Sequence, residues 1–488
     1  MQFKSSKKRE RKEAKLYHAL IPLTFLVASL VYILIIKREY PEQADGLGPH
    51  LALFSSGIVA AGVAIFMLGY TWKYIQKGFL DTIKVSLEAS IILIIIGMLV
   101  GTWILSGVVP VMIFYGLKVI SPEAFLPTVV LLCTVISLAS GSSWTTAATV
   151  GIAMMGVGSG LGIPGYVTAG AVISGAYMGD KMSPLSETTN LAPAMAGTDL
   201  FTHIRHMLYT TIPSYIISLI LFIFIGMKYS KSNMNTSNID LILSGLDQQF
   251  NLSPWLMLVP LCVIVIVLLK VPAIPGLALA AAIGGIAAIL VQGSSLVEVL
   301  IAAQSGFTSN SGVEIIDSLL TRGGLESMLS TVCLIIFAVF FGGVMEKTKM
   351  LDAISKYILH FARNRGLLIT STVATSGITN LISGDQYISI IMPGRMFRKV
   401  YLDRGYAPEN LSRTLEDAGT LLSPLIFWNT CGAYMIVTLG VSPWVYVPFC
   451  FFNLINPIVA IIYGFTGFSI KKLSPEAIEH EAAAINSH

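Results

Sequence analysis

About twelve stretches of the sequence are long and apolar enough to cross a lipid bilayer as helices. A spanning helix needs about 20 mostly apolar residues. Only 12% of the 488 residues are charged, whereas soluble domains carry about 25% charged residues. A water-facing surface cannot be covered with so few charges, so we predict an all-α polytopic membrane protein with about twelve transmembrane helices. The apolar stretches centre on Val27, Ala60, Ile95, Leu131, Ala171, Leu219, Ile264, Ala281, Phe337, Ile369, Ile436 and Ile458.

Basic residues cluster on one predicted side of the membrane. Lys and Arg are enriched in cytoplasmic loops, and the loop at 41–49 has acids but no bases, so we expect that loop outside. The basic N-terminus is interpreted as a retained cytoplasmic tail and not as a nucleic-acid-binding arm. Both termini are therefore predicted to be cytoplasmic. The basic residues are Lys7, Lys8, Arg9, Arg11, Lys12 and Lys15, then Lys73, Lys77, Lys84, Arg395, Arg398, Lys399, Arg404, Arg413, Lys471 and Lys472.

The pattern of spans and polar segments divides the chain into two halves. A polar stretch that is too short for a domain separates them. The predicted segments are a basic cytoplasmic tail at 1–17, a first transmembrane half at 18–229, a polar connecting loop at 230–251, a second transmembrane half at 252–466 and a cytoplasmic C-terminal tail at 467–488.

The two halves contain a weak internal repeat. The sequence SGSSW at 140–144 resembles SGDQY at 383–387, and Gly141 and Gly384 are 243 residues apart. The tripeptide Ser-Pro-Leu occurs in both halves, with Pro184 and Pro424 240 residues apart. Two similar pairs in the same order at nearly the same offset indicate a duplication.

Duplicated halves with helix breaks are typical of secondary transporters. Many such carriers are two repeats, often inverted, whose discontinuous helices form a site near the midplane. Irregular backbone is tolerated in a membrane only where protein or water covers it. We therefore expect two inverted repeats with broken helices or re-entrant hairpins, interrupted at Pro184 and Pro424. The alternative for each proline is an ordinary kink in a packed helix.

Ionisable and polar residues within these apolar segments are the candidate ion-binding groups. Charged side chains inside a membrane are costly and mark transport pathways. Asp180 is the first candidate, because it follows a helix of small residues and precedes the break at Pro184. An ion pair with Lys181 is the structural alternative for this acid. The full candidate set is Asp180, Ser142, Ser143, Thr145, Glu187 and Asn190 in the first half, and Asp385, Asp417 and Asn429 in the second.

Each of these groups also has a structural interpretation. Asp417, with Glu416, could lie at the membrane surface, where an acid needs no function. The hydroxyls of Ser142, Ser143 and Thr145 could satisfy the backbone of a broken helix instead of binding a cation. The two roles are compatible for the hydroxyls.

The string GDKMSPLSETTN at 179–190, together with SGSSW at 140–144, resembles the NhaC-type sodium/proton antiporter family. The segment at 416–430 is also similar to that family, and the likeness covers most of the chain. The resemblance implies a single-chain, multi-pass antiporter of the plasma membrane that exchanges sodium for protons. A related proton- and sodium-coupled malate/lactate antiporter is similar in the same stretches and is the alternative. The absence of an evident cluster of buried Arg or Lys favours a cation.

The expected partners are therefore sodium, protons and the lipid bilayer, with malate or lactate as alternative cargo and a homo-oligomer as an allowed assembly. We expect no nucleic acid, no cofactor and no metal site beyond that of transported sodium. The chain is not expected to be an enzyme. The remote alternative is an intramembrane aspartyl protease using Asp180 and Asp385, although the glycine that would begin its Gly-x-Gly-Asp motif is missing. A channel is a third alternative.

Overall fold

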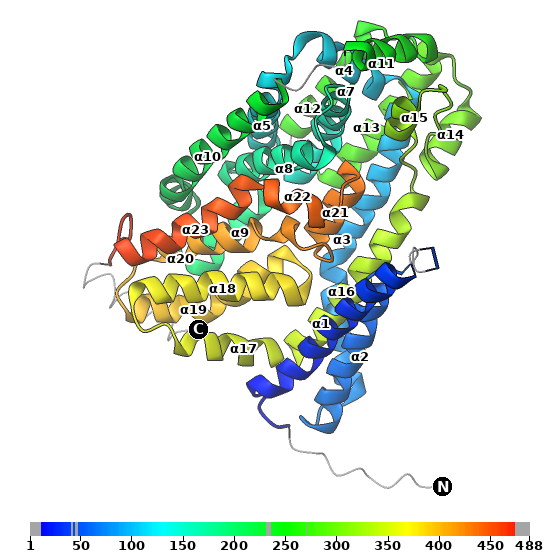
Figure 1. The fold of residues 1–488 in the computed structure, drawn as a ribbon. Helices are drawn as coiled ribbons and strands as arrows, with labels where there is room; N and C mark the ends of the chain where they lie inside the picture. Colours follow the sequence, from blue (N-terminus) through cyan, green and yellow to red (C-terminus); the bar gives the residue numbers. More distant parts are fainter. Residues whose placement is uncertain (1–10, 41, 44–46, 231–235, 270, 474–488) are drawn as a thin grey trace, which may run out of the picture.

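The computed structural model describes residues 11–40, 42–43, 47–230, 236–269 and 271–473. This part of the chain consists of helices joined by loops, with two isolated β-bridges (Figure 1). The predicted all-α class is confirmed for it. The predictions that concern Lys7, Lys8, Arg9, residues 41 and 44–46 of the external loop and the end of the C-terminal tail fall outside the described residues.

The first half contains α1 to α10, and α11 lies in the stretch that we expected to be a connecting loop. Ile242 and Leu246 of α11 are one turn apart and buried, which explains why this polar stretch forms an amphipathic helix. The elements are α1 Leu16–Glu39, α2 His50–Phe66, α3 Trp72–Leu105, α4 Val108–Val119, α5 Pro122–Ser140, α6 Ser143–Thr146, the π-helix η1 Ala147–Gly151, α7 Ile152–Gly160, α8 Gly165–Met182, α9 Glu187–Ala196, α10 Leu200–Ser230 and α11 Thr236–Gln249.

The second half contains the remaining helices and ends with α23. Its elements are the 3₁₀-helix η2 Pro254–Met257, α12 Leu258–Leu268, α13 Ala273–Ala287, the π-helix η3 Ala288–Gln292, α14 Leu296–Ser305, α15 Glu314–Leu320, the 3₁₀-helix η4 Glu326–Met328, α16 Leu329–Lys347, α17 Met350–His360, α18 Arg365–Ser383, α19 Gln386–Asp403, α20 Pro408–Leu415, the π-helix η5 Glu416–Thr420, the 3₁₀-helix η6 Ser423–Leu425, α21 Thr430–Leu439, α22 Pro443–Tyr446, the 3₁₀-helix η7 Val447–Phe449 and α23 Phe451–Thr466.

Fewer helices than predicted are both long and apolar enough to cross a membrane. The described residues contain six such helices, or eight if two bent pairs each count as one span, so twelve spans are not confirmed. Every one of the twelve predicted centres nevertheless lies in a helix. The difference arises because helices such as α2 and α12 are short, and inner helices such as α8 and α18 carry many small or polar residues.

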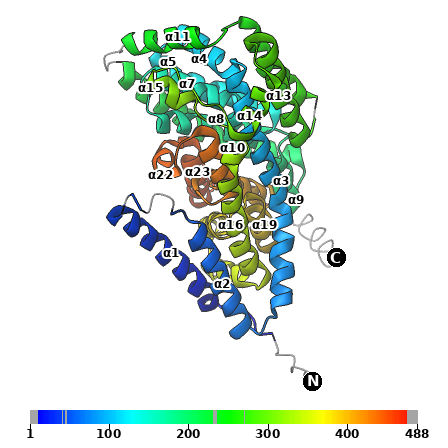
Figure 2. The same cartoon turned by 90° about the vertical axis from the view of Figure 1, so that its right-hand side faces the viewer.

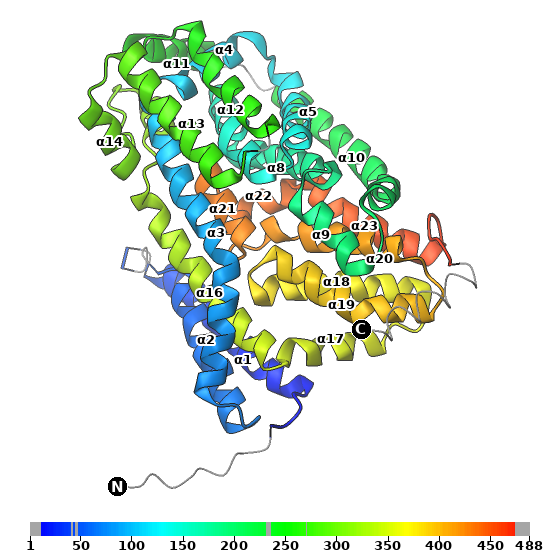
Figure 3. The same cartoon turned by 180° about the vertical axis from the view of Figure 1, so that it is seen from behind.

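The helices pack in several groups, one of which is arranged along the long helix α3. Helix α3 packs along α16, α13 and α14, and it runs through much of the molecule in Figures 2 and 3. Helices α5, α8 and α10 pack together, as do α18, α19 and α20. Helix α23 contacts both groups through α10 and α18. The two sequence halves are therefore interleaved and do not form separate domains.

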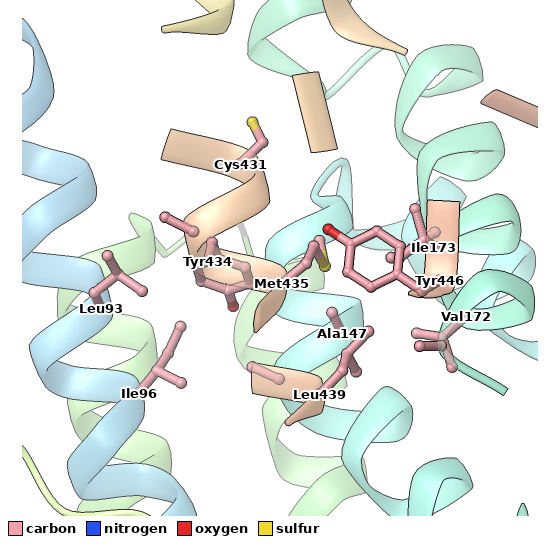
Figure 4. Packing of buried hydrophobic residues seen from close by; sticks show 14 of the residues in the cluster. Leu93, Ile96, Ala147, Val172, Ile173, Cys431, Tyr434, Met435, Leu439 and Tyr446 are labelled. Atoms are coloured by element: carbon pink, nitrogen blue, oxygen red, sulfur yellow. The ribbon is translucent and has the colours of Figure 1, made fainter. Parts of the chain in front are cut away.

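The apolar core lies where helices of both halves meet. Figure 4 shows α21 of the second half between α3 and the π-helix η1 of the first half, with α8 and α22 beside them. Burying apolar side chains stabilises such contacts even between helices that also face lipid, because the side chains fill space closely. The labelled side chains are Leu93, Ile96, Ala147, Val172, Ile173, Cys431, Tyr434, Met435, Leu439 and Tyr446.

The internal repeat is visible as a constant spacing between helix boundaries. Five helices of the first half begin 243 residues before a helix of the second half, and α5 and α18 are both 19 residues long. This register differs from the one predicted for the Ser-Pro-Leu tripeptides, because Pro184 and Pro424 are only 240 residues apart and do not occupy equivalent positions. The pairs are α5 and α18, α6 and α19, α8 and α20, α9 and α21, and α10 and α22.

Both prolines nevertheless lie at interruptions between helices. Pro184 lies in the turn between α8 and α9, and Pro424 lies in η6, before a bend of 47° that leads into α21. Proline has no N–H to donate and fits poorly in a helix interior. Both predicted positions thus lie where one helix ends before the next begins, although the two interruptions are not related by the repeat.

Glycine permits the close packing of α8 on α5. A methyl group at Gly175 or Gly179 would collide with main-chain oxygens of α5. The close approach lets Ser137 of α5 donate a hydrogen bond of 2.6 Å to the carbonyl of Ala176. Small residues commonly serve this purpose in membrane helices. This packing places the end of α8, and therefore Asp180, against the end of α5.

Candidate functional site

A cavity of about 620 Å³ lies where the two repeats meet. Polar residues from the ends of α5, α8, α9 and α18 line one part of it, and α3 and α13 line another. Its lining includes Lys84, Glu88, Ser140, Gly141, Ser142, Ser143, Trp144, Thr145, Asp180, Ser186, Glu187, Thr188, Asp385, Gln386, Tyr387 and Thr430, with apolar residues of α3, α13 and the α8–α9 turn. Six of the nine residues that the sequence predicted are in this wall.

Four pairs of lining residues are related by the repeat. Each pair has one member from each half, separated by 243 residues. The pairs are Ser142 and Asp385, Ser143 and Gln386, Trp144 and Tyr387, and Glu187 and Thr430. Equivalent positions of both repeats therefore face one cavity, which is the arrangement expected of a site between repeats.

The repeat also preserves the local turn that carries these residues. Gly141 and Gly384 end α5 and α18 in the left-handed conformation, with φ of 68° and 66°. That conformation costs glycine little. The next residue in each half caps the following helix: Ser142 accepts from the N–H of Thr145, and Asp385 accepts from that of Ile388. The chain thus reverses sharply and exposes capping oxygens beside the cavity.

Asp180 is in the last turn of α8 and is 8% exposed. Its Oδ2 accepts hydrogen bonds from the N–H of Ser143 at 3.1 Å and from the hydroxyl of Ser143 at 2.7 Å. The equivalent pair in the second half is Ser423 and Gln386, whose Oγ and Oε1 lie 3.3 Å apart. The first half therefore has a carboxylate where the second half has a hydroxyl, so the site is chemically asymmetric.

Asp385 has a clear structural role in addition to its place in the wall. Its Oδ1 accepts hydrogen bonds from the N–H groups of Tyr387 at 2.8 Å and Ile388 at 3.2 Å. These bonds satisfy donors at the start of α19, where a negative charge also interacts favourably with the helix dipole. The carboxylate retains a second oxygen, Oδ2, that is not used by these bonds.

The hydroxyl cluster of the first half also satisfies the backbone. Thr145 donates its hydroxyl hydrogen to Ser142 Oγ at 3.1 Å, and Thr146 donates to the carbonyl of Ser142 at 3.0 Å. The structural interpretation of these hydroxyls therefore holds. The lone pairs of Ser142, Ser143 and Thr145 still face the same cavity as Asp180.

Glu187 and Tyr387 connect the two repeats across the cavity. The hydroxyl of Tyr387, in the first turn of α19, donates a hydrogen bond to Oε2 of Glu187, at the start of α9. Sequence reasoning identified Glu187 but missed Tyr387, and it also missed Glu88 on α3. Only the place of Tyr387 within the SGDQY repeat could have indicated it, since the partners are 200 residues apart.

Three predicted residues lie outside the cavity wall. Asn190 donates to the carbonyls of Pro184 at 2.9 Å and Ser186 at 2.7 Å, which ties α9 to the turn before it. Asn429 caps α21 by accepting from the N–H of Cys431 at 3.1 Å. Asp417 forms an ion pair with Lys181 in the interior. All three side chains have structural partners.

The sequence left open an ion pair between Lys181 and its neighbour Asp180. Lys181 does form a buried ion pair, but its partner is Asp417. Lys181 and Asp417 are both 0% exposed, and Arg413, also fully buried, lies 3.9 Å from the same carboxylate. The expectation that Arg413 marks the cytoplasmic surface is therefore wrong. The sequence did not reveal that Lys181 and Arg413 are buried near each other, but both cations already face an acid. Charges in the interior require such partners.

A resident metal site is not apparent in the part of the chain that the structure describes. No group of three or more His, Cys, Asp or Glu side chains there could hold a metal ion. Asp180 and its neighbours offer carboxylate and hydroxyl oxygens instead, which are suitable for a transported hard cation.

The chain is similar to known transporters over most of its length. The chain is 39% identical over 455 residues to the Na⁺/H⁺ antiporter NhaC of Alkalihalophilus pseudofirmus, covering 93% of this chain and 97% of that one. It is 41% identical over 418 residues to NhaC of Bacillus subtilis, covering 86% and 92%. The malate-2H⁺/Na⁺-lactate antiporter of B. subtilis is 38% identical over 421 residues, covering 86% and 89%.

A profile of the Na⁺/H⁺ antiporter family matches residues 175–468, which include the end of α8, Asp180 and the whole second repeat. The relatives carry the names of transporters, which favours transport over proteolysis. The apolar helices agree with a protein that resides in a membrane. The family resemblance seen in the GDKMSPLSETTN string is confirmed, and this chain belongs to the Na⁺/H⁺ antiporter family.

Proposed function

We propose that this protein is a secondary antiporter that exchanges sodium ions for protons across the cell membrane by alternating access. The observation that carries the proposal is the position of Asp180, whose carboxylate is hydrogen-bonded to Ser143 in the wall of a cavity between two repeats. A titratable group at the junction of two similar halves can exchange its ligand as the halves move.

The charges of the cavity wall favour a cation. Among the described residues, four acidic residues line it, against one basic residue, Lys84, whose side chain is largely exposed. Such a surplus of acids attracts positive ions and repels anions. The acids are Glu88, Asp180, Glu187 and Asp385.

In the simplest form of this exchange, sodium and a proton would compete for Asp180. Hard cations prefer oxygen ligands, and oxygens of Ser142, Ser143 and Thr145 lie in the same wall. A sodium ion bound to ionised Asp180 excludes the proton, and protonation removes the charge that holds sodium. Exchange follows if the repeats change orientation only when the site holds sodium or a proton. Inward proton flow would then drive sodium out of the cell.

The orientation follows from the positive-inside rule. Lys73 and Lys77 begin α3, and Lys84, which follows on the same helix, lies at the cavity. We place this end of α3 and both termini in the cytoplasm, so that the cavity faces inward. The two halves, 18–229 and 252–466, would then be inverted repeats that rock against each other around Asp180.

Exchange of malate for lactate is the second candidate. It is favoured by the 38% identity to a protein named for that exchange and by a cavity large enough for an organic acid. The start of α19 could attract a carboxylate, but the carboxylate of Asp385 already caps it. The acidic wall therefore ranks this candidate below sodium.

Transport in reconstituted proteoliposomes tests both candidates. Gradients of sodium, lithium, potassium, malate or lactate are imposed while internal pH is recorded with a trapped dye. We expect sodium to move protons and malate and lactate to leave the signal unchanged. Asp180→Asn should abolish the response, because Asn is nearly isosteric but cannot titrate. Asp199→Asn is the matched control, since Asp199 caps α10 outside the cavity. Unaltered exchange in Asp180→Asn would rule out Asp180 as the carrier.

A further inference from the structure

A second group of buried charges lies beside the cavity but outside its lining. It joins α8, α20 and η5, with α10 and α23 alongside. Lys181 donates to Asp417 and, at 3.1 Å, to Asn456 Oδ1, while Thr210 donates to Asp417 at 3.1 Å. These bonds and the nearby Arg413 stabilise the ionised carboxylate of Asp417, which therefore has a structural role. They leave one acid of the group, Glu416, without a cationic hydrogen-bond donor.

Glu416 is fully buried and incompletely satisfied. Its Oε1 accepts one hydrogen bond, from the hydroxyl of Thr188 at 2.9 Å. Its Oε2 is buried and has no hydrogen-bond partner within the part of the chain that the structure describes. Burial of an ionised carboxylate with a single donor is costly, and uptake of a proton removes the charge. Asp417 differs in having a cationic donor, because its Oδ1 accepts from both Lys181 and Thr210, although its Oδ2 also has no hydrogen-bond partner among the described residues.

Burial favours the protonated form of Glu416, whereas the neighbouring cations favour the ionised form. Both protonation states of Glu416 are therefore accessible. With Glu416 ionised, the two buried cations and two buried acids sum to zero charge; with Glu416 protonated, the group carries one positive charge. Lys181 attracts the ionised form, whereas Asp180 repels it. Helices α18, α19 and α23 contribute uncharged groups to the same turn: Asn380 and Ser389 bind the carbonyl of Gly419, and Asn453 binds that of Leu421. Helix α10 adds two buried titratable groups, His203 and His206, which face Lys181 and Arg413 respectively.

Thr188 connects Glu416 to the cavity. Its side chain belongs to the cavity wall and donates to Glu416, and its oxygen also lies 3.2 Å from the hydroxyl of Ser186, another lining residue. A proton can therefore reach Glu416 in one step. The Thr188 hydroxyl gives its proton to Oε1 and takes another from a hydronium ion that enters the cavity, which becomes water, so that one O–H bond forms for each that breaks and no hydroxide is left.

We propose that Glu416 binds the exchanged proton, while the cation binds separately at Asp180. This inference rests on the proposed exchange of sodium for protons and replaces competition at one carboxylate by coupling between two. Protonation of Glu416 leaves an excess positive charge on a group whose Lys181 follows Asp180 directly in the chain. That charge weakens sodium binding at Asp180, and bound sodium opposes it in the same way. Such coupling is necessarily reciprocal.

The test separates proton coupling from cation binding in the full-length protein in proteoliposomes. Two assays are run on each variant: sodium-driven proton movement, and exchange of ²²Na⁺ against unlabelled sodium at equal pH on both sides. Glu416→Gln keeps the size of the side chain and cannot titrate. We expect it to lose sodium-driven proton movement and to retain ²²Na⁺/Na⁺ exchange. Asp180→Asn should lose both activities.

Two further variants distinguish a role in proton binding from a role in folding. Glu409→Gln removes an acid that precedes Glu416 by seven residues in the sequence and pairs with Lys471 at 3.1 Å. This variant should keep both activities. Thr188→Val removes the donor to Glu416 and should slow proton movement more than ²²Na⁺ exchange, whereas Thr188→Ser should restore it.

The outcomes are distinct. Sodium-driven proton movement that persists in Glu416→Gln, or loss of ²²Na⁺ exchange in that variant, overturns the assignment of Glu416 and leaves the antiporter proposal standing. A wild-type protein that moves no protons in response to sodium overturns both.

Discussion

The hydroxyl of Tyr387 on α19 donates a hydrogen bond to the carboxylate of Glu187 on α9, so that one bond joins the two repeats at the wall of their shared cavity. Both residues lie in the first turn of their helices, and each has a lining counterpart in the other repeat. An alternating-access movement that separates the repeats must lengthen or break this contact. In the proposed alternating-access cycle, the bond would therefore stabilise one orientation over the other.

Tyr387→Phe should shift the carrier away from the orientation seen here. A hydrogen bond to a charged group contributes about 1.5–3 kcal/mol, so the population ratio of the two orientations should change by roughly tenfold or more. Sodium-dependent ²²Na⁺ uptake measures this as a change in apparent affinity for sodium on the two sides of the membrane. Tyr166→Phe, which lies outside the cavity wall, serves as the control. Unchanged affinities on both sides would show that the contact does not bias the equilibrium.

Asp385 can be tested for an ionic role apart from its capping role. Asn caps helices about as well as Asp, whereas Ala costs about 0.5–2 kcal/mol. Asp385→Asn should therefore keep the thermal unfolding midpoint in detergent and still weaken sodium binding, because a negative charge is removed from the wall. Asp385→Ala should lower both. If Asp385→Asn transports sodium with wild-type affinity, then Asp385 is a helix cap alone.

The small residues of α8 should be required for stability. Gly179→Ala places a methyl group against the main chain of α5 at Thr134, which cannot move aside as a side chain can. Overpacking of this kind costs about 1–3 kcal/mol. We expect a lower unfolding midpoint and less folded protein by fluorescence-detected size exclusion. Gly62→Ala on α2 is the matched control, because nothing lies within 4 Å of the added methyl group. Equal midpoints for both variants would contradict the packing argument.

Local features of the sequence were sufficient to predict the helices and the positions at which they are interrupted. Each apolar stretch became a helix, and Asp180 was identified because it combines an acid with a small-residue helix and a proline break. The exact register of the repeat was harder to predict from the sequence. The Ser-Pro-Leu tripeptides match at an offset of 240 residues, whereas the helix boundaries repeat at an offset of 243. Local identity of three residues was weaker evidence than the glycine caps of Gly141 and Gly384.

Contacts between distant segments could not be predicted in the same way. Lys181 and Asp417 are 236 residues apart, and neither has a neighbour in sequence that indicates the other. Arg413 appeared to belong to a basic cytoplasmic cluster, but the π-helical turn of η5 brings Asp417 to within 3.9 Å of it in the interior. Only the folded arrangement of α8 against α20 and η5 reveals why two buried cations are tolerated.

The Lys181–Asp417 pair should stabilise the junction between the repeats. Removing one partner of a buried pair leaves an uncompensated charge and costs about 3–5 kcal/mol. Lys181→Met and Asp417→Asn should each lower the unfolding midpoint strongly, and the double variant should lose less than the sum of the two, because no unpaired charge remains between these positions. Lys356→Met is the control, since its ion pair with Glu13 is exposed and such pairs contribute about 0–1 kcal/mol. Additive losses in the double variant would show that the two side chains are not energetically coupled, and that Arg413 alone compensates Asp417.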